Sequence, residues 1–377
     1  MPELLDLFAI SAPGLAPFLG DELRELGLPV GEVTPAGVAM RGSLADVYRA
    51  NLHSRLATRV VVRLATFEAT HFSTLDKRLR AVEWSRWLAP GAAVACRVTC
   101  RKSRLYHSDA VAERVQGAIA RSLAHQAVEP GDEEDDDGTH QLLLVRLDHD
   151  RCTVSLDSSG ALLHRRGYRL AVAKAPLRET LAAAMLRGAG WDGSRPLADP
   201  CCGSGTIPIE AAMVARRLAP GRNRSFAFEG WPGMARRQWG EIRAAAAAAE
   251  RPAAPVAVAG SDRDAGAIQS AMENAARAGV SADIAFSRCA LSAARPGDTA
   301  PGLVVVNPPW GARIGEAAEL RNLYAALGKA MRGPFVGWDL ALLAADARLA
   351  GQVGCDFASV FSTTAGGTKV TLGVASA

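Results

Sequence analysis

The chain has 377 residues, of which 49% are hydrophobic, and its formal net charge is +4. This length predicts two or three domains rather than a single core. No apolar run reaches the roughly 18 residues of a membrane span, and the N-terminus lacks the basic-then-apolar order of a signal peptide, so we expect a cytoplasmic protein without a membrane partner. The seven cysteines are scattered and odd in number, which favours neither a disulfide framework nor a metal site.

Charge is unevenly distributed in the first half of the chain. Residues 1–170 hold 21 Lys and Arg against 22 Asp and Glu, but seven of these acids lie between Glu129 and Asp137. Outside that stretch the half is basic, as a surface facing RNA or DNA requires, although ordinary surface arginines explain the same excess. The run Asp132–Asp137 is predicted to be a solvated loop, with an autoinhibitory or RNA-mimicking role as the alternative.

The first half alternates short strands with helices in an α+β pattern. The spacing of apolar residues predicts strands over 4–10, 38–41, 58–67, 93–101, 141–147 and 151–156. The same spacing predicts helices over 15–26, 44–52, 74–87 and 109–125, the last of them with Ser108 as its N-cap.

The pattern changes at Leu177, after which helices alternate with short apolar strands. Helices are predicted over 177–188, 207–218, 265–278 and 320–331, and strands over 196–198, 256–259, 284–286, 302–306, 338–343 and 368–374. Such alternation is typical of a doubly wound, mostly parallel α/β sheet. Residues 222–251, which include Trp231 and Trp239, are predicted to be an insertion between the second helix and the second strand.

A glycine-rich turn follows the first of these strands, in the stretch Asp199-Pro200-Cys201-Cys202-Gly203-Ser204-Gly205-Thr206. Backbone N–H groups in such a turn can accept an anionic or zwitterionic ligand. Pro208 stands where a dinucleotide fingerprint needs glycine, and no phosphate-binding lysine follows, so both familiar nucleotide interpretations are disfavoured. Asp262, at the end of the next strand, suits the two hydroxyls of a ribose; the alternative is a helix N-cap, for which Asp264 is at least as well placed.

A second motif, Asn307-Pro308-Pro309-Trp310, directly follows the apolar run 303–306. The two prolines fix the backbone, so the Asn307 side-chain oxygen and the Pro308 carbonyl become two positioned acceptors. Two acceptors suit an exocyclic amine, and Trp310 could stack on the nucleobase that carries it. The alternative is a proline-stiffened loop with a packed tryptophan.

These motifs carry a family resemblance. The stretches 199–212 and 307–315 resemble the class I S-adenosylmethionine-dependent methyltransferases that act on amino groups, and more narrowly the THUMP-domain RNA guanine-N2 methyltransferases of 23S rRNA or tRNA. The stretches 11–15, 49–52, 58–60 and 162–169 are similar to the N-terminal half of that family, so the resemblance covers nearly the whole chain.

The resemblance implies a domain organisation. A Rossmann-like, seven-stranded class I methyltransferase domain would occupy 170–377. An α+β RNA-binding region would precede it, with a ferredoxin-like part over 1–55 and a THUMP-like domain over 56–165. The resemblance also implies S-adenosyl-L-methionine as the cofactor, RNA as the partner and no metal, and we expect a monomer.

The resemblance assigns the site residues position by position. The target base would be held by Asn307, Pro308, Pro309 and Trp310, and the cofactor by Asp199, Cys201, Gly203, Ser204, Gly205, Thr206, Asp262, Arg263 and Cys289. Contacts to RNA are predicted at Arg101, Lys102, Arg104, Arg165 and Arg166. The chain departs from the family at two positions: Trp310 replaces a more usual tyrosine, and Cys289 stands where an aspartate commonly lies near the cofactor adenine.

The predicted function is therefore direct methyl transfer to guanine N2 in structured RNA, in 23S rRNA or alternatively in tRNA. A base inside a helix is unreachable, so the target has to be unpaired or flipped. A second interpretation keeps the cofactor and changes the acceptor to adenine N6 or a protein glutamine amide. A third, which the change at Cys289 favours, is a non-catalytic RNA-binding or assembly protein that retains the fold.

Overall fold

The computed structural model describes residues 3–131, 138–169, 177–297, 299–309 and 317–377. The acidic run Asp132–Asp137 and Trp310 lie outside the described residues. The chain divides into two compact units. The N-terminal unit comprises Met1–Ser11, Leu19–Leu163 and Arg224–Ala244, and the C-terminal unit comprises Ala12–Phe18, His164–Asn223 and Ala245–Ala377.

The described part of the N-terminal unit contains an eight-stranded sheet in the order β2-β3-β1-β4-β8-β7-β5-β6. Its strands are β1 Leu5–Ser11, β2 Val30–Thr34, β3 Gly37–Gly42, β4 Ala57–Glu68, β5 Ala93–Arg101, β6 Gln126–Val128, β7 Gln141–Asp148 and β8 Arg151–Asp157. Strand β4 pairs with β1 through its first half and with β8 from Val61 onward. This long strand therefore joins the two halves of the sheet.

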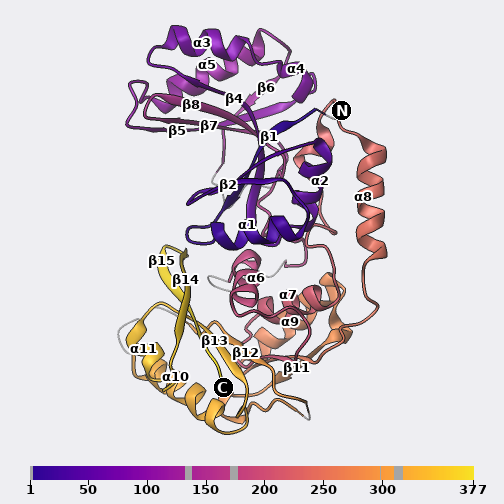
Figure 1. The fold of residues 1–377 in the computed structure, drawn as a ribbon, viewed down its shortest axis with the longest axis vertical. Coiled ribbons are helices and arrows are strands. Elements are labelled where there is room, and N and C mark those ends of the chain that lie inside the picture. The colour runs from indigo at the N-terminus through magenta and orange to yellow at the C-terminus, as the bar shows by residue number, and fades with distance from the viewer. Residues whose placement is uncertain (1–2, 132–137, 170–176, 298, 310–316) are drawn as a thin grey trace. The chain divides into compact units, whose positions relative to one another are not determined.

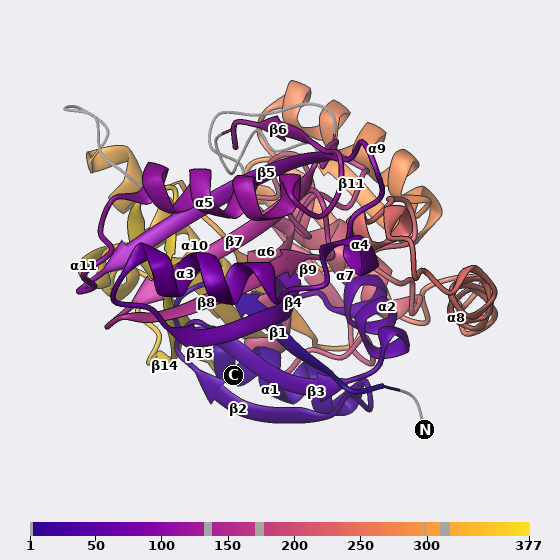
Figure 2. The same cartoon turned by 90° about the horizontal axis from the view of Figure 1, so that it is seen from above.

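The structure describes five helices between residues 16 and 120: α1 Ala16–Glu25, α2 Leu44–His53, α3 Phe72–Arg80, α4 Trp84–Trp87 and α5 Ser108–Ala120. Figures 1 and 2 show α3 and α5 together on one side of strands β5, β7 and β8. The single helix predicted over 74–87 is wrong, because the indole of buried Trp84 donates to the Leu79 carbonyl at 3.1 Å and ends α3. The predicted N-cap at Ser108 is also wrong: His107 holds that position, and Ser108 is the first helical residue.

The segment Arg224–Ala244 belongs to the N-terminal unit, although the residues on either side of it belong to the C-terminal unit. It holds the 3₁₀ turn η1 Ala227–Gly230 and most of helix α8 Arg236–Ala248. The Tyr48 ring centroid lies 4.6 Å from that of Phe228 and 5.8 Å from that of Trp239, and the Tyr48 hydroxyl accepts a hydrogen bond from the Ala235 N–H at 3.0 Å. Trp231 donates to the Gln141 side chain at 2.8 Å. Aromatic packing thus fixes this inserted segment to the N-terminal unit.

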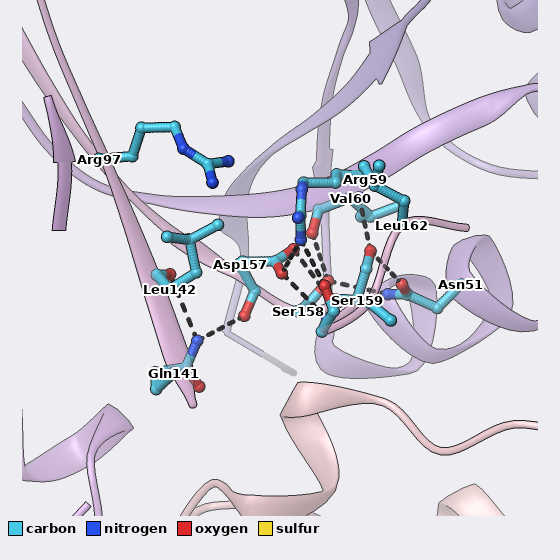
Figure 3. A network of polar contacts seen from close by, with 12 residues as sticks. Asn51, Arg59, Val60, Arg97, Gln141, Leu142, Asp157, Ser158, Ser159 and Leu162 are labelled. Atoms are coloured by element: carbon cyan, nitrogen blue, oxygen red, sulfur yellow. Dashed lines mark hydrogen bonds and ion pairs between the residues drawn. The ribbon is translucent and has the colours of Figure 1, made fainter. Parts of the chain in front are cut away.

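A buried ion pair anchors the centre of the N-terminal unit (Figure 3). Arg59 Nη1 lies 2.6 Å from Asp157 Oδ2, and the two side chains are 1% and 0% exposed. The Asp157 carboxylate also accepts the backbone N–H groups of Ser159 and Gly160 at 3.0 and 2.9 Å. Ser159 in turn donates its hydroxyl to Asn51 on α2 at 2.7 Å. The network therefore ties β4, the end of β8 and α2 together.

We expect Arg59→Met to lower the free energy of unfolding of the N-terminal unit by about 3–5 kcal/mol, because it leaves the Asp157 carboxylate buried without its cation. The exposed pair Arg24–Asp21, whose side chains are 53% and 62% exposed, provides the control. Arg24→Met should cost about 0–1 kcal/mol. Urea unfolding followed by tryptophan fluorescence measures both, and equal shifts in the two variants would contradict a structural role for the buried pair.

The described part of the C-terminal unit contains a seven-stranded sheet in the order β11-β10-β9-β12-β13-β15-β14. Its strands are β9 Leu197–Asp199, β10 Val258–Asp262, β11 Ile284–Arg288, β12 Leu303–Val306, β13 Asp339–Ala344, β14 Ala358–Ala365 and β15 Thr368–Ala375. The first five are mutually parallel, and β15 runs antiparallel between β13 and β14. The predicted seven-stranded, doubly wound sheet is confirmed.

The helices of this unit are α6 Glu179–Gly188, α7 Thr206–Ala215, α9 Ala265–Ala278, α10 Ala317–Arg332 and α11 Ala347–Gly351. Asp264 caps α9, since its Oδ1 accepts the N–H groups of Gly266 and Ala267 at 2.7 and 3.2 Å. Gly279 ends the same helix with φ of 76°. Both ends of α9 agree with the sequence prediction, and Asp262 is left free of the capping role.

The order of the strands fixes where a ligand can bind. From β9 the sheet is extended through β10 to β11 on one side and through β12 to β13 on the other. Ligands of doubly wound sheets bind at such a switch point, beyond the carboxyl ends of the strands. Among the described helices, none has the length and apolar character needed to cross a membrane.

Candidate functional site

The site is built on the turn that follows β9. Asp199, the last residue of that strand, is 2% exposed, and its Oδ1 accepts the Cys201 N–H at 3.0 Å. The Cys202 N–H donates to the Ser261 carbonyl at 3.0 Å, and the Gly205 N–H donates to the Cys202 carbonyl at 2.8 Å. The turn is thus held by its own backbone and by strand β10, and Gly205 then becomes the N-cap of α7.

The two glycines of this turn have different reasons to be glycine. Both have positive φ, 51° at Gly203 and 83° at Gly205. A Cβ on Gly205 would lie 2.9 Å from Ala271 Cβ and 3.2 Å from the Phe286 ring, so this position allows the close packing of α7 on α9 and β11. A Cβ on Gly203 would meet no atom of the described residues within 4 Å. Gly203 therefore faces open space, where a ligand can approach the backbone.

Asp262 links the turn to the end of β10. Its Oδ2 accepts the Gly203 N–H at 3.0 Å, and its Oδ1 accepts the Asp264 N–H at 3.0 Å. Each carboxylate oxygen keeps further acceptor capacity, which is what two ribose hydroxyls require. The Asp262 carbonyl also accepts the Cys289 N–H at 2.9 Å, so the loops after β9, β10 and β11 are connected through this one residue.

A cavity of about 280 Å³ lies against the ends of β9, β10 and β11. Asp199 and Cys289, both predicted cofactor residues, line it together with Ser287 and Phe335. Cys289 is half-buried, and its thiol lies 3.2 Å from the Ala290 carbonyl. The remaining predicted cofactor positions lie beside these strand ends. Cys201, Gly203, Ser204 and Gly205 lie in the turn after β9, and Thr206 is the first residue of α7. Asp262 is the last residue of β10, and the exposed Arg263 follows it.

Burial controls the ionisation of this site. Burial raises the pKa of Asp199 to about 8, and the nearby negative charge of Asp262 adds to the rise. Burial likewise raises the pKa of Cys201 and the pKa of Cys202, so both remain thiols rather than nucleophilic thiolates at neutral pH. A cationic ligand group beside Asp199 would favour its charged form.

Asp199 should make stability depend on pH. Its folded-state pKa lies above the ordinary aspartate value. The stability that this raised pKa contributes is therefore fully present below about pH 4 and is lost as the pH rises through about 8. We expect Asp199→Asn to gain stability relative to the unmodified protein between pH 5 and 8, by up to about 1.4 kcal/mol per pH unit. Urea titrations at several pH values measure this difference.

The control is Asp192→Asn, because Asp192 is exposed and its pKa is lowered by hydrogen bonds from Ser194. The stability that this lowered pKa contributes is present above about pH 4 and is lost only in acid. The difference in unfolding free energy between Asp192→Asn and the unmodified protein should therefore stay constant between pH 5 and 8. A flat difference for the Asp199 variant as well would contradict a raised pKa.

The second motif follows β12, whose four residues are buried. Asn307 is half-buried, Pro308 is buried and Pro309 is exposed. Asn307 Oδ1 is inaccessible to solvent and has no hydrogen-bond partner in the part of the chain that the structure describes. A buried acceptor without a partner is costly and calls for an explanation.

The predicted RNA contacts fall into two groups. Arg101, Lys102 and Arg104 are exposed in the N-terminal unit. Arg165 is half-buried, whereas Arg166 is 2% exposed, with its Nε 3.6 Å from Glu210 Oε1, whose side chain is fully buried. The structure thus places Arg166 inside the C-terminal unit and not on a surface where it could meet a phosphate.

One residue of the site was not predicted from the sequence. Asn274 on α9 is fully buried, and its Nδ2 donates to the Ser204 carbonyl at 3.0 Å. Its Oδ1 accepts Arg277 Nη2 at 2.5 Å, and Arg277 Nε donates to the Tyr168 carbonyl at 2.7 Å. These contacts attach the glycine turn to helix α9. No motif marks an asparagine inside a helix, so only the fold reveals this role.

Both parts of the chain match known protein families. The model of the RMKL-like methyltransferase domain matches residues 166–358, and that of the RlmL ferredoxin-like domain matches residues 6–61. The chain belongs to the RMKL-like methyltransferase family. The predicted family resemblance and the Rossmann-like methyltransferase fold with a ferredoxin-like N-terminal part are confirmed.

Among its relatives are ribosomal RNA large subunit methyltransferases K/L. The one from Syntrophotalea carbinolica is 38% identical over 94% of this chain and 51% of the relative. The one from Methylococcus capsulatus is 38% identical over 94% of this chain and 49% of the relative. The chain thus spans about half the length of these curated relatives. A Synechocystis protein named as a candidate RNA methyltransferase is 34% identical over 97% of this chain and 95% of its own length.

Solved structures with the same fold cover the full chain. SMU.472, solved in complex with SAH, has a TM-score of 0.88 and 27% identity over 100% of this chain and 99% of its own. A protein of Listeria monocytogenes, named as an N6-adenine-specific DNA methylase, has a TM-score of 0.86 and 31% identity over 98% of this chain and 96% of its own. TrmN from Thermus thermophilus, at 22% identity and a TM-score of 0.71 over 99% of both chains, shares the fold.

Proposed function

We propose that this protein is an S-adenosylmethionine-dependent methyltransferase that methylates the N2 amine of a guanosine in structured RNA, specifically in 23S rRNA. The observation that carries the proposal is the buried Asn307 Oδ1, an acceptor without a partner among the described residues. It lies at the carboxyl end of β12, the strand beside β9 on which the glycine turn is built. An exocyclic amine would supply the missing hydrogen.

The residues around the glycine turn fit the cofactor. Open space at Gly203 leaves room for close approach, Asp262 offers acceptors for ribose hydroxyls, and buried Asp199 suits a cationic amino group. When bound, S-adenosylmethionine supplies a methyl group on a positively charged sulfur, which is electrophilic without a metal. The relative SMU.472, solved with SAH, supports this cofactor.

The residues after β12 would orient the target base. The lone pair of an exocyclic amine is delocalised into the ring, so the amine is a poor nucleophile until its hydrogens are held. Asn307 Oδ1 and the Pro308 carbonyl would accept these two hydrogens and direct the lone pair outward. Pro308 and Pro309 restrict the backbone, so the acceptors need no reorganisation during the reaction. Stacking by Trp310 remains a prediction.

The names of the ribosomal RNA relatives and the exposed basic residues of the N-terminal unit support RNA as the substrate. We assign the RNA-holding role to a THUMP-like region within 56–165. Methylation of adenine N6 is the second candidate, because the Listeria relative is named for that activity and the same two acceptors suit that amine. The third candidate is a non-catalytic RNA-binding or assembly protein that retains the fold, which the cysteine at position 289 favours; equilibrium binding of S-adenosylmethionine distinguishes it from an enzyme.

Asn307→Ala should lower kcat by roughly 10²–10³, because it removes one positioned acceptor, and should leave the Kd for S-adenosylmethionine unchanged. Transfer of a labelled methyl group to 23S rRNA transcripts measures the first quantity, and calorimetry the second. Asn307→Asp keeps an acceptor oxygen and should retain more activity than the alanine variant. Full activity in Asn307→Ala would sink the proposed role of this motif.

A further inference from the structure

A groove of about 740 Å³ lies on the eight-stranded sheet, and all its lining residues belong to the N-terminal unit. Its floor is formed by strands β1, β4, β8, β7 and β5, with Phe8 and Leu144 among the apolar side chains. Five arginines line it: Arg63, Arg97, Arg101, Arg146 and Arg151. Among the described residues that line it, Asp148 is the single carboxylate. These described residues therefore carry four more formal positive charges than negative ones.

Strand register brings these arginines to one face. Arg63 pairs with Ser155, Ser155 with Leu144, and Leu144 with Arg97, which forms one row across β4, β8, β7 and β5. A parallel row is formed by Arg151, Asp148 and Arg101. Paired residues on adjacent strands point to the same side of a sheet. The four strands thus present a common basic surface.

The charges of this surface are only partly used within the protein. Arg146 lies 2.8 Å from Asp148, and the Arg63 guanidinium lies 4.2 Å from the centre of the Phe8 ring. The exposed side chains of Arg101 and Arg151 make no hydrogen bond or ion pair with other described residues. Two guanidinium groups at one end of the groove are therefore available for an anion.

We propose that this groove binds an unpaired segment of the RNA whose methylation is proposed above. This inference rests on the proposed function, since it names the part of the protein that holds the RNA. Of the residues predicted as RNA contacts from the sequence, Arg101 lies in the groove, whereas Lys102 and Arg104 do not line it.

The spacing of the arginines favours a chain of phosphates over one anion. Arg97 and Arg101 are four residues apart on β5, which is about 13 Å along a strand, and Arg63 is three strands away from Arg97, which is about 14 Å. A single phosphate cannot reach across either distance. The volume of the groove lies in the range of sites for small ligands, about 300–1,000 Å³, which is enough room for a short stretch of single strand.

Binding of fluorescein-labelled oligouridine of about 12 nucleotides tests this inference, with fluorescence anisotropy as the readout. The groove variant replaces Arg101, Arg146 and Arg151 by Gln. The control variant replaces Arg24, Arg121 and Arg237 by Gln, which removes the same charge from exposed positions outside the groove. All six side chains are exposed, so both variants should keep the melting temperature of the unmodified protein.

We expect the groove variant to bind oligouridine roughly tenfold to a hundredfold more weakly, with its salt slope reduced by about 2. The control variant should change affinity by less than about threefold. An equal loss in both variants, or tighter binding of an RNA duplex of the same length by the unmodified protein, would overturn the groove as a site for unpaired RNA.

Calorimetry with S-adenosylmethionine on the same samples separates this inference from the proposed function. Unmodified protein that binds oligouridine through the groove but does not bind the cofactor contradicts the proposed methyl transfer alone. Protein that methylates RNA while both triple variants bind oligouridine equally well contradicts the groove alone.

Discussion

The parallel alignment of β9, β10 and β12 is the constraint on which the candidate site depends. Each strand ends in one polar residue: Asp199, Asp262 and, one position beyond β12, Asn307. Because neighbouring parallel strands end at the same edge of a sheet, three residues far apart in sequence come to one place. All four residues of β12 are buried, and Asn307 is the first residue after this strand that is only half-buried.

Hydrogen bonds then convert this edge into a defined site. The Asp262 carboxylate accepts the Gly203 N–H, and the Asp262 backbone carbonyl accepts the Cys289 N–H, so three loops are connected through this residue. Asn274 supports the turn from α9. Two buried groups stand out at this edge: the Asp199 carboxyl, whose pKa burial raises, and the Asn307 amide oxygen, which has no hydrogen-bond partner among the described residues. Under the proposed function, they would meet a cationic group and an amine.

Much of this could be predicted from the sequence, since most strands of the C-terminal unit are short apolar runs and α9 has a clear cap at Asp264 and a clear end at Gly279. The predictions failed where tertiary contacts override local pattern. The indole of Trp84 ends α3 inside a continuous helical pattern. Strand β14 was not predicted because its residues are half polar, and Arg166 was predicted on a surface although its charge is buried beside Glu210. The arginine groove depends on register between four strands, which a single sequence does not reveal.

The proposed methylation of guanine N2 in 23S rRNA is tested most directly by mass spectrometry of nucleosides. Digests of 23S rRNA and of tRNA from a strain that lacks this protein are compared with digests from the parent strain. We expect N2-methylguanosine to be reduced in 23S rRNA from the deletion strain and to return when the gene is restored. Loss of N6-methyladenosine instead, or identical nucleosides in both strains, would contradict it.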